Sequence, residues 1–195
     1  SGDATYTISV AQNKFTDSAD NNNSASNTFS WTYDSTPPTI SGVTLASDNT
    51  TMTVTFSEAV YNTNSGSGSL EVDDFVFALS GGDATLSSTT PSSISINGNE
   101  YTLGISLSGT PNGSETLTVN PVSSSIYDLA GNVASTSQSN NSISLNDKLS
   151  PTMTISSSTV NSGEKSNDST ISITFTSSES TTNFIESDIT ISGGS

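Results

Sequence analysis

The sequence predicts an all-β protein built from antiparallel β-sandwich modules in tandem, with one complete central module between two partial ones. Three observations predict this. Large apolar residues recur at every second position, Gly, Asn and Pro separate those runs, and motifs near the start of the chain recur further along. No stretch shows an apolar period of 3.6 residues, so we expect very little helix.

Alternating apolar and polar residues mark the expected strands in order along the chain. Each run places its large side chains on one sheet face and Ser, Thr or Asn on the other. The apolar members are Tyr6/Ile8/Val10, Phe29/Trp31/Tyr33, Val43/Leu45, Met52/Val54/Phe56, Ile94/Ile96, Tyr101/Leu103/Ile105/Leu107, Leu117/Val119, Ile143/Leu145, Met153/Ile155, Ile171/Ile173/Phe175 and Ile189/Ile191. Because Trp31 alternates with other aromatic residues, we expect it in a core rather than on a sugar-stacking platform.

Turn residues separate these runs. Residues 97–99 (Asn-Gly-Asn) lie between two alternating segments and predict a hairpin. Residues 80–82 and 192–194 (both Ser-Gly-Gly) end strands at matching places in the chain. Many short strands with breaks of this kind favour a sandwich over a βαβ fold.

Three motifs occur twice. Residues 17–21 (Asp-Ser-Ala-Asp-Asn) are echoed by residues 128–132 (Asp-Leu-Ala-Gly-Asn). Residues 34–40 are echoed by residues 147–153, and residues 51–56 by residues 170–175, at offsets of 113 and 119 residues. These offsets fit one β-sandwich module of about 100 residues.

The repeats predict three regions. Residues 1–35 are expected to be the C-terminal part of a module, residues 36–147 a complete sandwich, and residues 148–195 the N-terminal part of a further module. The chain is then either a window on a longer array, or its two ends complete each other within or between chains. A module assembled from the two ends would lack the hairpin region expected at residues 84–107.

The composition excludes several classes of function. Asp plus Glu total 19 and Lys plus Arg total 3, for a net charge of −16. Nucleic acid binding needs a cationic surface, and no apolar run approaches a membrane span, so neither partner is expected. The absence of Cys and His removes thiol and Ser-His catalysis and zinc sites built on those ligands. Since the carboxylates lie in short turns without a sign of a cleft, we expect no catalysis.

Carboxylates near the module junctions form the candidate metal site. Asp34 and Asp147 precede the linker prolines, and Glu58 and Glu179 follow matching strands. Acidic groups gathered at a junction repel one another unless a cation bridges them, and calcium prefers several oxygen ligands. These four residues therefore predict interdomain calcium, with solvated acidic turns as the alternative.

The paired turns at residues 17–21 and 128–132 predict structural turns, because Asp and Asn side chains stabilise turns and Gly131 can take a positive φ. Calcium binding is the alternative for these turns, although the full EF-hand pattern is missing. Asp20 stands where the second copy has Gly131, so a left-handed turn there relies on the tolerance of Asp for that conformation.

The stretches at residues 8–22, 31–40 and 54–60, including Trp-Thr-Tyr-Asp-Ser-Thr-Pro-Pro-Thr-Ile at 31–40, resemble bacterial immunoglobulin-like repeats. Such repeats belong to very large surface adhesins and other extracellular repeat proteins. The resemblance covers essentially the whole chain. It implies an immunoglobulin-like sandwich in each module and a stalk, spacer or fibre outside the cell, sometimes stiffened by calcium.

We therefore expect a structural, stalk- or fibre-forming repeat segment of a large extracellular surface protein. The expected partners are neighbouring immunoglobulin-like repeats of the same or an adjacent chain, and the receptor stays open. The alternative is a carbohydrate- or surface-binding β-sandwich module. An exposed aromatic cluster would favour that alternative, and burial of Trp31, Tyr33, Tyr61 and Tyr101 would weaken it.

Overall fold

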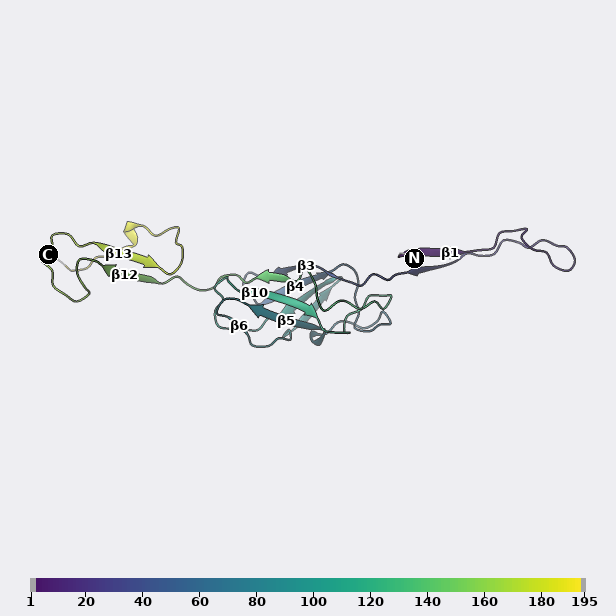
Figure 1. The fold of residues 1–195 in the computed structure, drawn as a ribbon, viewed down its shortest axis with the longest axis horizontal. Coiled ribbons are helices and arrows are strands. Elements are labelled where there is room, and N and C mark those ends of the chain that lie inside the picture. The colour runs from purple at the N-terminus through teal and green to yellow at the C-terminus, as the bar shows by residue number, and fades with distance from the viewer. Residues whose placement is uncertain (1–2, 194–195) are drawn as a thin grey trace. The chain divides into compact units, whose positions relative to one another are not determined.

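The computed structural model describes residues 3–193, and these residues form an all-β protein with several antiparallel sheets (Figure 1). The expectation of very little helix is confirmed for this range, which contains two three-residue 3-10 helices, η1 (Val72–Asp74) and η2 (Glu186–Asp188). The chain divides into two compact units, Ser1–Lys148 and Leu149–Ser195. Among the described residues, no helix is long and apolar enough to cross a membrane.

Residues 36–147, called the central module below, contain two main sheets. The first has the strand order β3-β4-β8-β7, formed by β3 (Ile40–Leu45), β4 (Thr51–Phe56), β8 (Glu100–Gly104) and β7 (Ile94–Asn97). The second has the order β11-β10-β5, formed by β11 (Ser142–Ser144), β10 (Thr116–Pro121) and β5 (Phe75–Ser80). A small sheet pairs β6 (Thr85–Leu86) with β9 (Leu107–Ser108).

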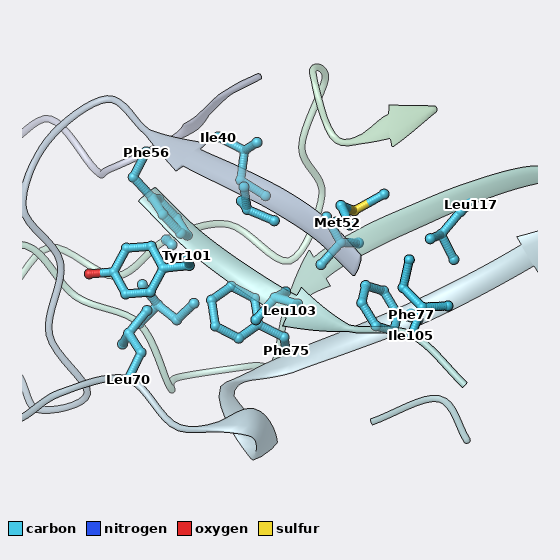
Figure 2. Close-up of a cluster of buried hydrophobic side chains, with 14 of the residues drawn as sticks. Ile40, Met52, Phe56, Leu70, Phe75, Phe77, Tyr101, Leu103, Ile105 and Leu117 are labelled. Carbon is cyan, nitrogen blue, oxygen red and sulfur yellow. The ribbon is translucent and has the colours of Figure 1, made fainter. Parts of the chain in front are cut away.

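The core lies between these two sheets, an arrangement consistent with a β-sandwich. Met52, Val54 and Leu103 of the first sheet are fully buried, as are Leu117 and Val119 of the second. Figure 2 shows part of this core, with aliphatic and aromatic side chains packed together. Within it the Phe56 and Tyr101 rings meet edge to face, with their centroids 5.6 Å apart. The predicted alternation is confirmed in β4, β8 and β10, because one face of each sheet packs on the other. It does not hold in the edge strand β7, where Ile96 is 47% exposed.

The hairpin predicted at residues 97–99 is confirmed. β7 and β8 pair with Asn97 opposite Glu100, so Gly98 and Asn99 form the two-residue turn. Gly98 has φ +61°, which is the left-handed conformation that such turns require.

The chain enters and leaves the central module at opposite ends of β3. It enters at Ile40, next to the buried Pro38. It leaves beyond the other end of β3, where Asn146 is bonded to the turn between β3 and β4. The Asn146 backbone N–H donates to Asn49 Oδ1 at 2.9 Å, and its side-chain amide donates to the carbonyl of Ala46 at 3.1 Å.

Residues 3–35, called the N-terminal segment below, form one hairpin. β1 (Ala4–Ile8) pairs with β2 (Phe29–Tyr33), with Tyr6 opposite Trp31 and Ile8 opposite Phe29. The expectation that Trp31 lies in a core is wrong for this structure, since the side chain is 46% exposed. The reason is that this segment supplies a single two-stranded sheet, and no second sheet among the described residues covers its apolar face.

Residues 149–193, called the C-terminal unit below, contain a second isolated hairpin. β12 (Met153–Ser157) pairs with β13 (Ile173–Ser177), with Ile155 opposite Phe175 and Met153 opposite Ser177. The phenyl rings of Phe175 and Phe184 lie 5.6 Å apart between centroids. Ile171, Ile189 and Ile191 lie outside the strands, although the alternation predicted strands there.

Candidate functional site

Three carboxylates meet where the chain enters the central module. Asp34, Glu58 and Asp128 each offer an oxygen atom, and these atoms all lie within 4.8 Å of one another. Asp128 is fully buried, and the other two are half-buried. Such a set of close acidic oxygens is the kind of donor group that a hard divalent cation takes.

Asp128 is held by the turn that it begins. Its Oδ1 accepts the backbone N–H of Asn132 at 2.8 Å, and its Oδ2 accepts the Asn132 side-chain amide at 2.8 Å. The Asp128 backbone N–H in turn donates to the Asn132 carbonyl at 3.1 Å. The prediction of a structural turn is therefore confirmed, and the same turn also places the Asp128 carboxylate in the acidic group.

Asp34 is tied to the same turn by its backbone. The Asn132 side-chain amide donates to the Asp34 carbonyl at 3.2 Å, so one asparagine contacts two members of the acidic group. The Asp34 side chain accepts the backbone N–H of Thr36 at 3.0 Å, which begins the turn into the linker prolines. Asp34 comes directly after β2, so this contact joins the N-terminal segment to the central module.

Glu58 comes two residues after β4 ends. Nearby, Tyr61 and Tyr127 exchange both backbone hydrogen bonds, at 2.7 and 2.8 Å, which brings the chain after Glu58 against the chain before Asp128. Burial raises the pKa of the Glu58 carboxyl, and the charges of Asp128 and Asp34 raise it further. The charged form of Glu58 is thus disfavoured in this group, and a bound cation would reverse that effect.

A glycine-rich loop packs against the Asp128 turn. Gly131 has φ +88°, and a Cβ atom there would lie 2.7 Å from the carbonyl oxygen of Asn64. A Cβ atom on Gly66 would likewise lie 2.7 Å from the side chain of Leu129. Both glycines are needed for this close approach, and the approach fixes the turn that carries Asp128.

The structure brings together two of the four predicted metal ligands. Asp34 and Glu58 lie in the acidic group with Asp128, whose turn the sequence predicted as structural, with calcium binding as the alternative. Asp147 is exposed in the first unit, and Glu179 lies in the second unit. The signal that could have identified Asp128 is the repeat of its turn at residues 17–21.

Glu179 nevertheless repeats the local setting of Glu58. The backbone N–H of Ser57 donates to the Thr39 carbonyl at 2.8 Å, and Ser178 donates to Thr152 in the same way at 2.9 Å. This places Glu179 at the position of Glu58, an offset of 121 rather than the 119 expected from the sequence echo. The Glu179 Oε1 atom is buried and has no hydrogen-bond partner within residues 3–193.

The turn at residues 17–21 repeats the three Asp–Asn hydrogen bonds of the turn at residues 128–132. Asp17 Oδ1 accepts the Asn21 backbone N–H at 3.0 Å, and Asp17 Oδ2 accepts the Asn21 side-chain amide at 3.1 Å. Asp20 takes φ +62°, which confirms the left-handed conformation expected there. Each element of the acidic group therefore has a second copy in the chain, in Asp17, Asp147 and Glu179.

Comparison of this chain with protein-family models, with curated proteins and with solved structures gave no match.

Proposed function

We propose that this chain is a structural segment of a tandem array of immunoglobulin-like β-sandwich modules, in a large extracellular surface protein that serves as a stalk or fibre. In this proposal residues 36–147 are one complete module. Residues 1–35 are the end of the preceding module, and residues 148–195 are the beginning of the next. The partners are neighbouring modules of the same or an adjacent chain.

The observation that carries this proposal is that hydrogen-bonding patterns of the central module recur on both sides of it. The Asp17 turn copies the Asp128 turn, and the Thr152–Ser178 pairing copies the Thr39–Ser57 pairing. Entry to and exit from the central module at opposite ends of β3 suit end-to-end stacking. The net charge of −16 favours a surface that stays soluble in a long array.

We further propose that calcium occupies the group formed by Asp34, Glu58 and Asp128. Three carboxylate oxygens within 4.8 Å repel one another strongly in a partly buried site, and a divalent cation turns that repulsion into attraction. Because Asp34 belongs to the linker and the other two belong to the central module, the cation would stiffen the junction. The competing interpretation is that these residues form solvated acidic turns without a cation. Calcium titration distinguishes the two, because only our proposal expects binding.

The array proposal is tested by reading the coding sequence on both sides of this segment and by locating the product in the cell. We expect further modules of about 100 residues, each with the paired Asp…Asn turn and a proline linker. Antibodies against the central module should label intact cells as strongly as permeabilised ones. Flanking sequence without such modules, or labelling only after permeabilisation, would remove the proposal.

The exposed aromatic face of the N-terminal segment favours a second candidate, a carbohydrate-binding module. Phe29, Trp31 and Tyr33 are 62%, 46% and 43% exposed, and the Tyr6 and Trp31 rings stack with centroids 5.4 Å apart. Tyr101, in contrast, is buried in the core of the central module. Since Trp31 is the single tryptophan, titration with polysaccharides should shift its fluorescence under this candidate, and unchanged emission eliminates it.

A further inference from the structure

Two asparagines of the central module directly precede a glycine, and no other asparagine in the sequence does. They are Asn97, before Gly98, and Asn112, before Gly113. Asparagine is a heat-labile residue, and it loses its side-chain amide most readily before glycine. Glycine has no Cβ atom to shield its backbone nitrogen, which can attack the side-chain carbonyl carbon of the asparagine. Because both sites share this local sequence, a difference in their reactivity must come from the fold.

Asn97 lies at the end of the β7–β8 hairpin with an unrestrained side chain. Asn97 and Gly98 are both exposed, and the Asn97 side chain makes no hydrogen bond within residues 3–193. The Gly98 N–H has no partner among these residues either, so its proton is accessible to solvent. A Cβ atom on Gly98 would have no neighbour within 4 Å. The turn therefore leaves open space around the attacking nitrogen.

Asn112, in contrast, is held by three hydrogen bonds. Its side-chain oxygen accepts the backbone N–H of Ser114 at 3.0 Å, and its side-chain amide donates to Asp83 Oδ2 at 3.4 Å. Its backbone N–H donates to the Glu115 carboxylate at 3.1 Å. Asn112 is also half-buried. Turning its side chain toward the Gly113 nitrogen would break the bonds at both ends of the amide.

Charge separates the two sites in the same direction. The attack moves negative charge from the backbone nitrogen to the side-chain oxygen. Asp83 and Glu115 both bond to Asn112, and Glu115 is fully buried. Negative charge that develops beside carboxylates is disfavoured, most strongly where water is excluded. Asn97 has Glu100 opposite it, but that residue is exposed, so water and salt screen its charge.

We propose that Asn97 is a site of spontaneous covalent modification in the folded protein, whereas Asn112 is protected. The Gly98 nitrogen forms a bond to Asn97 Cγ and gives up its proton to solvent, while the side-chain nitrogen leaves as ammonia. The product is a cyclic succinimide, which water opens. Breaking the bond between the Gly98 nitrogen and Cγ gives aspartate, and breaking its bond to the backbone carbonyl carbon gives isoaspartate. The reaction needs neither the array nor calcium, since both sites and their contacts lie in the central module.

Isoaspartate at position 97 would alter the hairpin. The chain then runs through the side-chain carbon, which adds one atom to the backbone just before Gly98. Asn97 lies opposite Glu100 and closes the turn, so the extra atom falls where the register of β7 against β8 is set. β7 is the edge strand of its sheet and in the described chain pairs with β8 alone. No second neighbour therefore holds β7 in place once the turn changes.

Peptide mapping of the aged protein measures both sites in one sample. Cleavage after glutamate places the two asparagines on separate peptides, residues 72–100 and 101–115. The folded 195-residue chain is incubated in mildly alkaline buffer and digested after increasing times. Mass spectrometry should show conversion of amide to acid at Asn97 at least about tenfold faster than at Asn112, whose side chain must first lose two hydrogen bonds. Isoaspartate-specific methyl transfer should label the first peptide.

The same chain in urea is the matched control. Unfolding removes the restraints on Asn112, so the two asparagines should then react at similar rates. Asp83→Ala removes the acceptor of the Asn112 amide but keeps the backbone N–H that Asp83 donates to Glu115. In the folded protein this variant should speed the reaction at Asn112 and leave that at Asn97 unchanged. Equal rates at the two sites in the folded chain, or no reaction at either until urea is added, would overturn the proposal.

Hydrogen exchange tests the effect on the hairpin. Aged protein that contains isoaspartate at position 97 should exchange the amides of β7 and β8 faster than fresh protein does. Asn97→Asp adds the same charge with a normal backbone, so it should retain the protection of fresh protein. If the aged protein and Asn97→Asp were protected equally, the backbone change inferred for position 97 would be refuted.

Discussion

Asp128 and Asn132 are joined by three hydrogen bonds, two of which use both carboxylate oxygens of Asp128. These bonds hold a fully buried carboxylate against Asp34 and Glu58. Asp17 and Asn21 make the same three bonds without such neighbours among the described residues. The same Asp…Asn turn is thus only a turn in the N-terminal segment, whereas in the central module it also positions a carboxylate in the acidic group.

Calcium is expected to stabilise the central module. Excess calcium should raise the melting temperature by several degrees, because ligand at about one hundred times its dissociation constant contributes roughly 2.7 kcal/mol. Chelation should restore the original value. Calorimetry with and without a chelator measures the shift.

The matched variants for this experiment are Glu58→Gln and Asp73→Asn. Glu58→Gln removes the negative charge of one ligand and should abolish most of the calcium-induced rise in melting temperature. Asp73 lies in η1, outside the acidic group, so its variant should retain the full shift. If calcium left the melting temperature of the wild-type protein unchanged, the proposed calcium site would be excluded.

The raised pKa of Glu58 gives a pH dependence of known sign. An acid whose pKa is raised on folding favours the folded state most at low pH, where it is protonated. Without calcium, stability from this group should therefore fall as pH rises from about the ordinary value of 4.5 through the raised folded value.

Glu58→Gln should remove this pH dependence and make the calcium-free protein more stable than wild type at pH 7. With calcium present the order should reverse, because the charged carboxylate is then a ligand. Urea unfolding of both proteins at several pH values, with and without calcium, measures this. The same order under both conditions would contradict the proposed role of Glu58.

The strand pattern of the central module could be predicted because its faces are sharply different. Met52, Val54 and Phe56 are buried while the threonines between them are partly exposed, as the two-residue period indicates. Asp34 and Glu58 could be predicted together because β3 begins, and β4 ends, at the same end of a hairpin. Local pattern was sufficient in both cases.

Other features depend on contacts that no local pattern contains. Asp128 lies near Glu58 because Tyr61 and Tyr127, which are far apart in sequence, exchange backbone hydrogen bonds. The echo of residues 51–56 at 170–175 is displaced by two residues in the structure, because the pairing places Ser177 rather than Phe175 at the position of Phe56. The exposure of Trp31 depends on which elements cover its face, and alternation alone cannot reveal that.

Glu115 is expected to contribute stability with the opposite pH dependence. Its fully buried carboxylate accepts the backbone N–H groups of Asp83, Ala84 and Asn112 at 3.1 to 3.3 Å. Burial, the largest single influence, acts to raise the pKa of Glu115, but these donors together hold it below its ordinary value. Stability from this group should be present above the ordinary value of 4.5 and be lost as pH falls through the lowered folded value.

Glu115→Gln should destabilise the central module by roughly 2 kcal/mol at pH 7, because an amide oxygen replaces a charged acceptor. Glu100→Gln, at an exposed position of β8, should change stability by less than about 0.5 kcal/mol. Chemical unfolding of both variants at pH 7 and pH 4 checks the magnitude and the sign. A Glu115 variant as stable as the Glu100 variant at pH 7 would show that the buried carboxylate holds no essential contact.

Gly131→Ala should disturb the acidic group without touching a carboxylate. A methyl group there meets the Asn64 carbonyl at 2.7 Å in a backbone conformation with φ +88°. Gly98→Ala is the matched control, because Gly98 also has a positive φ, +61°, but a Cβ atom there has no neighbour within 4 Å. The control should lose about 1 kcal/mol from backbone strain alone. Gly131→Ala should lose more and should also bind calcium more weakly, as titration calorimetry would measure. Equal losses in the two variants, with calcium binding unchanged, would mean that the loop containing Asn64 does not fix the Asp128 turn.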